Sequence, residues 1–298
     1  MPELPEVETI RRHLAPAVEG RRLTRLDVID ARWTLPLAPE RIVEAVQGRR
    51  VERLSRRGKY LVWELEDEAF LLLHLRMTGT LLLDPGEAPA HTRVDFELDG
   101  DHHVVFVDPR RFGTGELAVG AAARDAFFAA RLGLEPFDPG FTAARLYELT
   151  RRSRAPIKAF LLDQRKVAGV GNIYADEALH RARIHPLRPA DRLTRAQCAA
   201  LCDAVVASLA AGIDARGATI DDFRHPDGVS GSFQDLFAVH RREGLPCPRC
   251  GRAVRKLRAA GRGTYVCERC QPRPRRGSYA ASSRSSSRPA RSACTSSW

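Results

Sequence analysis

The sequence has no uninterrupted apolar run long enough to span a bilayer. The longest stretch, around Phe70 to Leu75, contains His74 and is followed by Arg76. The opening residues Met1-Pro2-Glu3 also lack the basic start and apolar core of a secretory signal. No internal repeat is visible. These absences argue against a membrane or secreted protein and favour a cytoplasmic one.

The composition is that of a soluble globular chain, with 298 residues, 44% of them hydrophobic and 29% charged. This length is enough for two modest domains and a small appendage. Residues 241–298 hold fifteen Lys or Arg against only Glu243 and Glu268, while the whole chain carries +11. The basic excess therefore lies at one end, as expected for an appendage that binds phosphate. For the basic residues after Gln271 alone, a solubilising tail is the simpler interpretation.

Four of the seven cysteines form two Cys-x-x-Cys pairs with sixteen residues between them: Cys247, Cys250, Cys267 and Cys270. Each pair can turn two thiolates toward one point, and two pairs complete a tetrahedral site, so we expect one structural Zn²⁺. A pair of redox dithiols is the weaker interpretation of this spacing. Cys198 and Cys202, one helical turn apart, are expected to be buried small apolar residues. Cys294 has no evident role.

The first part of the chain is dominated by short β-type segments. Residues 5–18 show helical apolar spacing with Gly20 at the end, and residues 41–46 suggest a second helix. A hairpin is expected around Asp99-Gly100. The predicted strands are 23–29, 51–54, 60–65, 70–75, 81–83, 94–98 and 104–107. We therefore expect an α+β protein that begins with an antiparallel β-sandwich and a helix laid across it.

The character becomes helical after a linker at residues 136–140. Predicted helices are 142–151, 157–162, 171–182 and 195–211, the last capped by Thr194. Residues 212–232 are rich in loop formers. The Ser-, Arg-, Pro- and Ala-rich end of the chain is too poor in apolar bulk to fold, so we predict disorder there. The predicted division is a β-sandwich domain (1–135), a helical domain (136–232), a zinc finger (233–271) and a tail (272–298).

The N-terminus offers a candidate nucleophile. A small second residue favours removal of Met1, which would leave Pro2 with a free secondary amine that titrates near neutrality. Such an amine attacks an aldehyde-like sugar carbon to give an iminium, as in lysine Schiff-base enzymes. Glu3 stands beside it as a proton donor and acceptor. Taken alone, however, Pro-Glu at a terminus is usually just the entry to a helix.

Six motifs in order resemble one family of repair enzymes. Met1-Pro-Glu-Leu-Pro-Glu-Val-Glu8 closely resembles the start of formamidopyrimidine-DNA glycosylases, which share their family with endonuclease VIII. The further matches are Gly58-Lys-Tyr-Leu61, His74-Leu-Arg-Met-Thr-Gly79, Asp108-Pro-Arg-Arg-Phe-Gly113, Gly169-Val-Gly-Asn-Ile-Tyr-Ala-Asp-Glu177 and the four-cysteine finger. The resemblance covers residues 1 to about 271. Six ordered motifs are far more specific than any single one.

The resemblance implies a bifunctional glycosylase and apurinic-site lyase of base excision repair, acting on damaged double-stranded DNA. In the family's mechanism Pro2 would attack C1′ of the damaged nucleotide, and Glu3 would assist as the base departs. Lys59 matches a lysine assigned to proton transfer in β-elimination, although it is also compatible with an ordinary strand-edge lysine. Arg262, five residues before Cys267, matches an arginine that grips phosphate and is linked to δ-elimination.

The same resemblance implies a void-filling trio, Met77, Arg110 and Phe112, because a flipped nucleotide leaves a hole in the stack. Apolar wedges lower the cost of unstacking, and arginine offers donors to the widowed base. Without the resemblance, Met77 and Phe112 would be assigned to the core. Arg110-Arg111 after Asp108-Pro109 is an unusual sequence for an interior, which favours an exposed loop.

The segment 169–172 lacks the lysine and glycine spacing of a P-loop. It resembles instead the helix–two-turns–helix motif of the family, in which backbone amides and the Asn172 side chain would approach DNA phosphate. Lys158, Arg154 and His91 match basic DNA-facing positions, though each is also compatible with a solvated surface group. Lys158 matches a position linked to recognition of the oxidised purine.

Leu4 favours the formamidopyrimidine branch, since the endonuclease VIII branch usually has Gly there. We therefore expect 8-oxoguanine and formamidopyrimidines as substrates. An endonuclease VIII-like enzyme for oxidised pyrimidines is the first alternative, and a noncatalytic DNA-binding member is the second. The loop 217–232, expected to cover the flipped base, is not diagnostic. We expect a monomer associated with the bacterial nucleoid, whose extra tail either adds salt-sensitive DNA affinity or does nothing.

Overall fold

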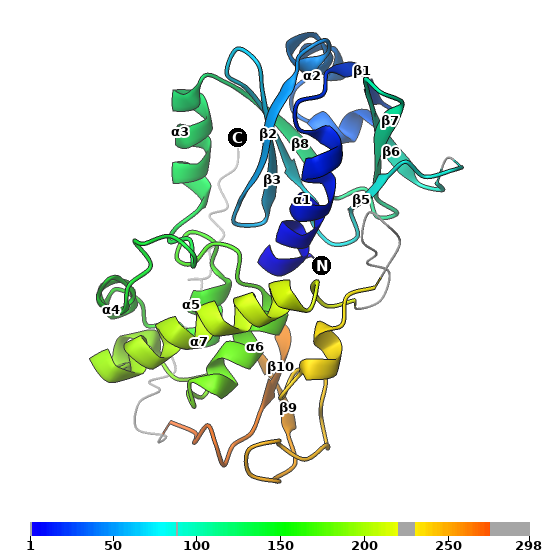
Figure 1. Cartoon of the computed structure of the whole chain (residues 1–298). Coiled ribbons are helices and arrows are strands. Elements are labelled where there is room, and N and C mark those ends of the chain that lie inside the picture. The colour runs from blue at the N-terminus through cyan, green and yellow to red at the C-terminus, as the bar shows by residue number, and fades with distance from the viewer. Residues whose placement is uncertain (1, 88, 220–229, 275–298) are drawn as a thin grey trace, which may run out of the picture.

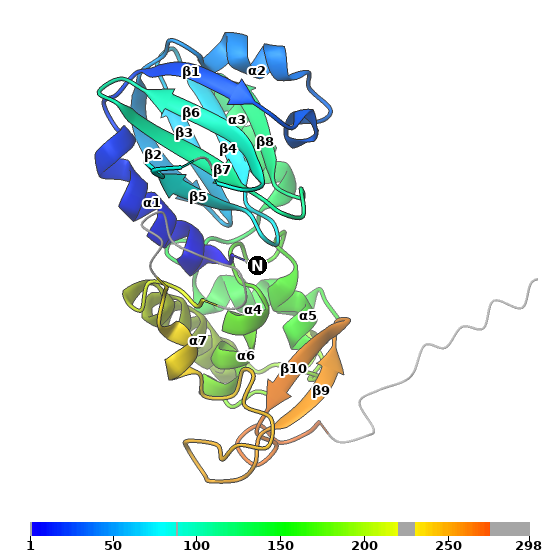
Figure 2. The ribbon, with the colours of Figure 1, turned by 90° about the vertical axis from the view of Figure 1, so that its right-hand side faces the viewer.

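A computed structural model gives the fold and describes residues 2–87, 89–219 and 230–274. Two four-stranded antiparallel sheets stack in its N-terminal half (Figure 2). One sheet has the order β1 (Leu23–Val28), β6 (Thr92–Leu98), β7 (His102–Val107) and β5 (Thr80–Leu83). The other has the order β2 (Val51–Arg57), β3 (Tyr60–Leu65), β4 (Ala69–His74) and β8 (Thr114–Val119). The predicted antiparallel sandwich is confirmed, including the β6–β7 hairpin that pairs Leu98 with His102.

Helix α1 (Leu4–Val18) runs along the sandwich and packs against β2 and β3. Its apolar positions are buried as the sequence predicted, and a capping box between Glu3 and Glu6 closes its N-terminus. The short α2 (Pro39–Val46), also predicted, contacts β1 and the 3₁₀ turn η1 (Ala31–Thr34). Figure 1 shows the N-terminal end of α1 pointing into the junction between the sandwich and the helical half. The sandwich therefore delivers the start of the chain to the middle of the molecule.

Three elements of this half were not predicted: η1, β8 and α3 (Ala121–Arg131). Strand β8 contains Gly115, a weak strand former, but a Cβ there would lie 2.2 Å from the Trp33 ring. The glycine is thus explained by packing, which sequence periodicity does not reveal. No residue of α3 is fully buried, and the helix covers the outer face of the second sheet with Phe127 and Phe128 against Tyr60. Because its apolar residues are only half-buried, the helix gives only a weak apolar periodicity in the sequence.

The second half is helical, as predicted. It contains α4 (Ala143–Arg151), α5 (Ile157–Leu162), α6 (Asn172–Arg181), the 3₁₀ turn η2 (Ala190–Arg192) and α7 (Arg195–Asp214). The hydroxyl of Thr142 caps α4, and Thr194 forms a capping box on α7. By length and composition α7 is long and apolar enough to cross a membrane, although no long uninterrupted apolar run marks it in the sequence. It packs against α1, α4 and α6, as the core helix of a globular unit does.

The four-cysteine finger follows the helices. It is preceded by the 3₁₀ turn η3 (Phe233–Leu236) and carries the hairpin of β9 (Arg255–Ala259) and β10 (Arg262–Val266). Figure 2 shows this hairpin standing beside α5 and α6. Most of the loop predicted to cover a flipped base, residues 220–229, lies outside the described residues. Residues 275–298, which hold most of the predicted tail, lie outside them as well.

The sandwich core predicts a large loss of stability for Phe96→Ala. The Phe96 ring is fully buried, stacked on Trp63 at 5.0 Å between centroids and packed edge-on against Trp33. Its truncation should lower the free energy of unfolding by about 3–5 kcal/mol. The matched control Phe112→Ala, at an exposed ring, should change it by less than about 0.5 kcal/mol. Denaturant unfolding compares the two, and equal losses would contradict the assigned core.

Candidate active site

The site is built where the N-terminal ends of α1 and α6 meet. The Leu4 amide donates to the Gly169 carbonyl oxygen at 3.1 Å, which ties the chain start to the loop before α6. The Glu3 carboxylate accepts from the Ile173 amide at 3.0 Å and the Tyr174 amide at 3.5 Å. A Cβ on Gly171 would lie 2.2 Å from the Glu3 carboxyl carbon, so glycine is required for this approach. Free amides and the positive end of the α6 dipole hold the carboxylate in place.

Glu6 is a buried member of this junction that sequence reasoning missed. Its carboxylate accepts hydrogen bonds at 2.8 Å from the Glu3 amide, the Tyr174 hydroxyl and the Ala218 amide. Burial raises the pKa of the Glu6 carboxyl, and the nearby charge of Glu3 adds to the rise. The residue connects α1, α6 and the start of the 217–232 loop. The only signal in the sequence is its place as the acidic partner in a capping box.

Lys59 lies in the β2–β3 turn and is only 5% exposed. Burial lowers the pKa of its ammonium, while the charges of Glu3 and Arg262 act on it in opposite directions. The turn is fixed by Glu135, whose carboxylate accepts from the Gly58 amide at 2.8 Å and from Arg56 at 2.6 Å. The structure therefore brings Lys59 to the same junction as the start of the chain.

The finger supplies Arg262, the exposed first residue of β10. The next residue is held by the helical half, because the Gly263 carbonyl oxygen accepts from Asn172 Nδ2 at 3.2 Å and Lys158 Nζ at 3.3 Å. The Asn172 Oδ1 atom is buried and has no hydrogen-bond partner among the described residues. The Asn172 side chain, at the start of α6, thus donates to one described residue through Nδ2, while its Oδ1 atom accepts from none.

Lys158 differs from expectation. Its side chain is 0% exposed, and the ammonium donates to Asp176 Oδ1 at 2.7 Å and Thr264 Oγ1 at 2.8 Å. Burial lowers the pKa of Lys158, although the Asp176 charge opposes this effect. These contacts attach Lys158 of α5 to α6 and to β10, and the predicted role of Lys158 toward DNA stays a prediction. The sequence shows a basic residue but not its buried acid partner.

The remaining predicted DNA-facing residues lie at the surface. Met77 is 37% exposed and Phe112 is 49% exposed, and the Arg110 guanidinium lies 4.8 Å from the Phe112 ring centroid. The expectation of an exposed loop around Arg110 and Phe112 is confirmed, and Met77 is exposed as well. The Arg154 side chain is 96% exposed and 4.0 Å from Asp191. His91 is also exposed.

The four finger cysteines lie together as predicted. Their sulfur atoms are all within 4.8 Å of one another, and two of the cysteines, Cys247 and Cys267, are almost fully buried. In the first knuckle the Gly251 amide donates to the Cys247 carbonyl oxygen at 2.8 Å, with Gly251 at φ 74°. Four thiolates in this arrangement match the donor set of a structural zinc site, so the finger holds one zinc ion. Cys198 and Cys202 are buried elsewhere, as expected.

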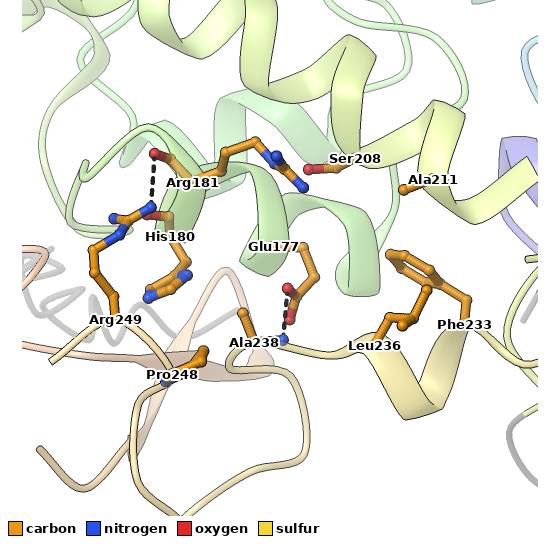
Figure 3. Close-up of a pocket in the computed structure, with 10 residues that line it drawn as sticks. All are labelled: Glu177, His180, Arg181, Ser208, Ala211, Phe233, Leu236, Ala238, Pro248 and Arg249. Carbon is orange, nitrogen blue, oxygen red and sulfur yellow. Dashed lines mark hydrogen bonds between the residues drawn. The ribbon is translucent and has the colours of Figure 1, made fainter. Parts of the chain in front are cut away.

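A separate cavity of about 580 Å³ lies between α6, α7, η3 and the first knuckle (Figure 3). Its lining includes Glu177, whose carboxylate is turned toward Ala238 and accepts from the amides of residues 238–240 at 2.9–3.0 Å. These bonds attach the finger linker to α6. None of the predicted catalytic residues lines this cavity. Glu177 therefore acts structurally, and the cavity is not the active site.

Family models match most of the chain. Residues 1–115 match the formamidopyrimidine-DNA glycosylase N-terminal domain, and residues 132–224 match the H2TH domain of the same glycosylases. Residues 244–273 match a zinc finger found in FPG and IleRS. The three matched segments correspond to the sandwich, the helices and the finger.

Curated relatives carry the name formamidopyrimidine-DNA glycosylase. The protein from Roseiflexus sp. is 44% identical over 91% of this chain and 100% of its own length. That from Thermus thermophilus is 44% identical over 91% of this chain and 98% of its own length.

Solved structures give the same result. The MutM (Fpg) protein from Thermus thermophilus superimposes with a TM-score of 0.82 at 43% identity, covering 91% of this chain and 98% of that one. Lactococcus lactis Fpg in complex with DNA containing an abasic site gives 0.84 at 34% identity, covering 91% and 100%. A mutant of the Lactococcus protein with Fapy-dG DNA gives 0.85 at 34% identity, with the same coverage.

The cysteine geometry predicts the metal content. The purified protein should contain one zinc ion per chain, and Cys267→Ser should lose it because a ligand is removed. Cys198→Ser is the matched control, since this buried thiol lies outside the cluster and should leave zinc unchanged. Atomic emission of the gel-filtered proteins measures the metal. Zinc retained by Cys267→Ser, or lost by Cys198→Ser, would show that the cluster is not the binding site.

Proposed function

The chain belongs to the formamidopyrimidine-DNA glycosylase family, and on this premise we propose that it excises oxidised purines, 8-oxoguanine and formamidopyrimidines, from duplex DNA. Members of this family are DNA glycosylases with AP-lyase activity, and this protein is such an enzyme. The observation that carries the proposal is the meeting of the start of α1 with the α6 N-terminus. The Lys59 turn lies beside them, since a Cβ on Gly58 would be 3.4 Å from the Ala168 side chain. We further propose that it acts as a monomer in the bacterial nucleoid.

Pro2 supplies the nucleophile in this proposal. Once Met1 is removed, the secondary amine bonds to C1′ while the bond from C1′ to the damaged base breaks and its electron pair leaves with the base. The amine then loses its proton, and its lone pair forms the iminium as the C1′–O4′ bond breaks. The electron pair of that bond goes to O4′, which takes up a proton as the sugar opens. Glu3 directly follows Pro2 in the chain and is buried, and it provides acid and base assistance as the base departs.

Elimination follows from the iminium, which acidifies the neighbouring sugar carbon. Lys59 serves in proton transfer for β-elimination, in which the 3′ phosphate leaves. Arg262 grips phosphate and supports δ-elimination, in which the 5′ phosphate leaves. Elimination on both sides of the sugar leaves a one-nucleoside gap.

Met77, Arg110 and Phe112 fill the hole left by the flipped nucleotide. Their exposure supports this role, because a buried side chain is unable to enter the stack. Arg154, His91 and the α6 N-terminus with Asn172 contact phosphates. Lys158, whose ammonium donates to Asp176 and Thr264, takes part in DNA binding and in recognition of the oxidised purine in this proposal.

Leu4 and the Fapy-dG complexes of the Lactococcus relative support the purine preference. A second candidate remains, because that relative has also been solved with DNA that contains an oxidised pyrimidine. Excision of oxidised pyrimidines is therefore the alternative substrate class. A purely DNA-binding role is disfavoured by the buried Glu3 and Lys59, which a binder would not need at one junction.

The proposal predicts covalent trapping through the Pro2 nitrogen. With a native terminus, borohydride should trap the protein on a duplex containing 8-oxoguanine opposite cytosine. A cleavable N-terminal extension should abolish trapping, because it converts the amine to a non-nucleophilic amide, and proteolytic removal of the extension should restore it.

The same trapping reaction is run on duplexes that contain oxidised thymine or an abasic site. Trapping only on oxidised thymine would replace the purine preference with the alternative. Absence of any adduct, including on an abasic site, would reject the catalytic proposal in favour of a DNA-binding protein.

Burial of Lys59 predicts the pH dependence of elimination. Because burial lowers its pKa, the neutral amine should form below the ordinary value of 10.5, so the elimination rate should rise with pH and level off below that value. Lys59→Arg keeps the positive charge but holds its proton and should lose this rise. Single-turnover cleavage of a preformed abasic site across pH provides the measurement. An unchanged profile in Lys59→Arg would remove Lys59 from proton transfer.

A further inference from the structure

Asp108 is a fully buried carboxylate that the proposed chemistry does not use. It directly follows β7 and begins the loop 108–113, which carries Arg110 and Phe112. The other void-filling residue, Met77, lies on the separate loop between β4 and β5. The two loops are about thirty residues apart in the chain, so local sequence alone does not fix their relative position.

The Asp108 carboxylate is fully engaged by these two loops. Its Oδ2 atom accepts from the Phe112 amide at 2.8 Å and from the Gly113 amide at 2.7 Å. Its Oδ1 atom accepts from the Arg110 amide at 3.2 Å and from the Thr78 hydroxyl at 2.5 Å. Three of these bonds shape the loop 108–113 itself. The fourth joins it to the residue next to Met77.

The Asp108 backbone reaches a third segment. Its amide donates to the His91 carbonyl oxygen at 3.1 Å, and its carbonyl oxygen accepts from Arg93 Nε at 2.9 Å. The same carbonyl oxygen accepts from the Arg111 amide at 3.3 Å. One residue thus contacts all three segments of the sandwich that carry proposed DNA-facing side chains.

Both void-filling loops also rest on one core ring. A Cβ on Gly79 would lie 2.9 Å from Phe106, and a Cβ on Gly113 would lie 2.4 Å from it. The two glycines therefore allow the loop backbones to sit directly on the ring. Phe106 is buried against Trp33, so the base beneath the loops is part of the sandwich core. The wedge side chains project from a rigid support.

We propose that Asp108 is a positioning residue that holds the Met77 loop and the Arg110–Phe112 loop in one fixed arrangement, with the Thr78 hydroxyl as the link between them. This inference rests on the proposed function, because it concerns how the void-filling side chains are aligned. Two wedges enter the stack together only if their separation is already set. A carboxylate whose four hydrogen bonds are all made specifies that separation strongly.

The inference separates two steps of the reaction. Base excision from a duplex requires flipping and filling of the hole, so it depends on the arrangement of the loops. Elimination at an abasic site in single-stranded DNA requires neither. A defect in positioning should therefore slow excision and spare elimination, whereas a general structural defect should slow both.

The test is Thr78→Val, which removes the link between the loops and keeps the side-chain shape. Single-turnover excision of 8-oxoguanine from a duplex should fall roughly tenfold or more, the effect of losing a hydrogen bond to a charged group. Cleavage of a single-stranded abasic oligonucleotide should stay unchanged. Thr78→Ser restores the hydroxyl and should restore excision.

Two further variants sharpen the comparison. Thr24→Val is the matched control, since its hydroxyl donates to the Glu97 carbonyl oxygen on another part of the sandwich, and both steps should be unaffected. Asp108→Asn replaces one acceptor oxygen by a donor and should give a larger excision defect than Thr78→Val. In a Met77→Ala/Arg110→Ala/Phe112→Ala background, Thr78→Val should add nothing, because the side chains through which it acts are gone.

A readout without catalysis keeps the two proposals distinguishable. 2-Aminopurine placed beside a tetrahydrofuran abasic analogue reports stacking by an inserted side chain, and wild-type protein should change its fluorescence more than Thr78→Val does. If wild-type protein neither excises nor traps yet shows this difference, the proposed function fails and the positioning role stands. Equal fluorescence in both proteins, or equal losses of excision and elimination, would overturn the positioning role.

Discussion

The meeting of two helix N-termini around buried carboxylates is the contact on which the rest of the structure depends. The start of α1 lies against the start of α6, and Glu3 accepts from the free amides of the second helix. Gly171 has no Cβ, which permits this approach. The contact joins the sandwich to the helical half at the point where the proposed nucleophile begins the chain. Displacement of either helix would separate Pro2 from its acid and base groups.

The finger is attached to this junction by a second set of buried polar contacts. Lys158 and Asp176 hold the residues that follow Arg262, and Glu177 holds the linker before the first knuckle. An ion pair without solvent exposure is costly to form, and its extra hydrogen bonds to β10 offset that cost. The consequence is geometric. An exposed arginine on a small zinc-bound hairpin has a defined position relative to Lys59, although the two lie on different halves of the molecule.

The division of labour between the halves follows from their rigidity. Strands and a stacked aromatic core support short loops whose tips carry Met77 and Phe112, so apolar side chains stay at the surface without rearranging. The helical half presents amide groups and Asn172 at helix ends, where phosphate is favoured. In the proposed function, the enzyme combines a wedge on a sheet scaffold with phosphate sites on helices.

The sequence by itself determined the elements with strong periodicity, the cap at Thr194, the four-cysteine cluster and, through its motifs, the family. These signals are local, because a cap, a turn or a metal knuckle is complete within a few residues. Tertiary structure alone decided the role of Glu6, the burial of Lys158, the strand at Gly115 and the contacts of Asp108. Each depends on a partner distant in the chain, and the energy of a buried charge or a missing Cβ is set by that partner rather than by neighbouring residues.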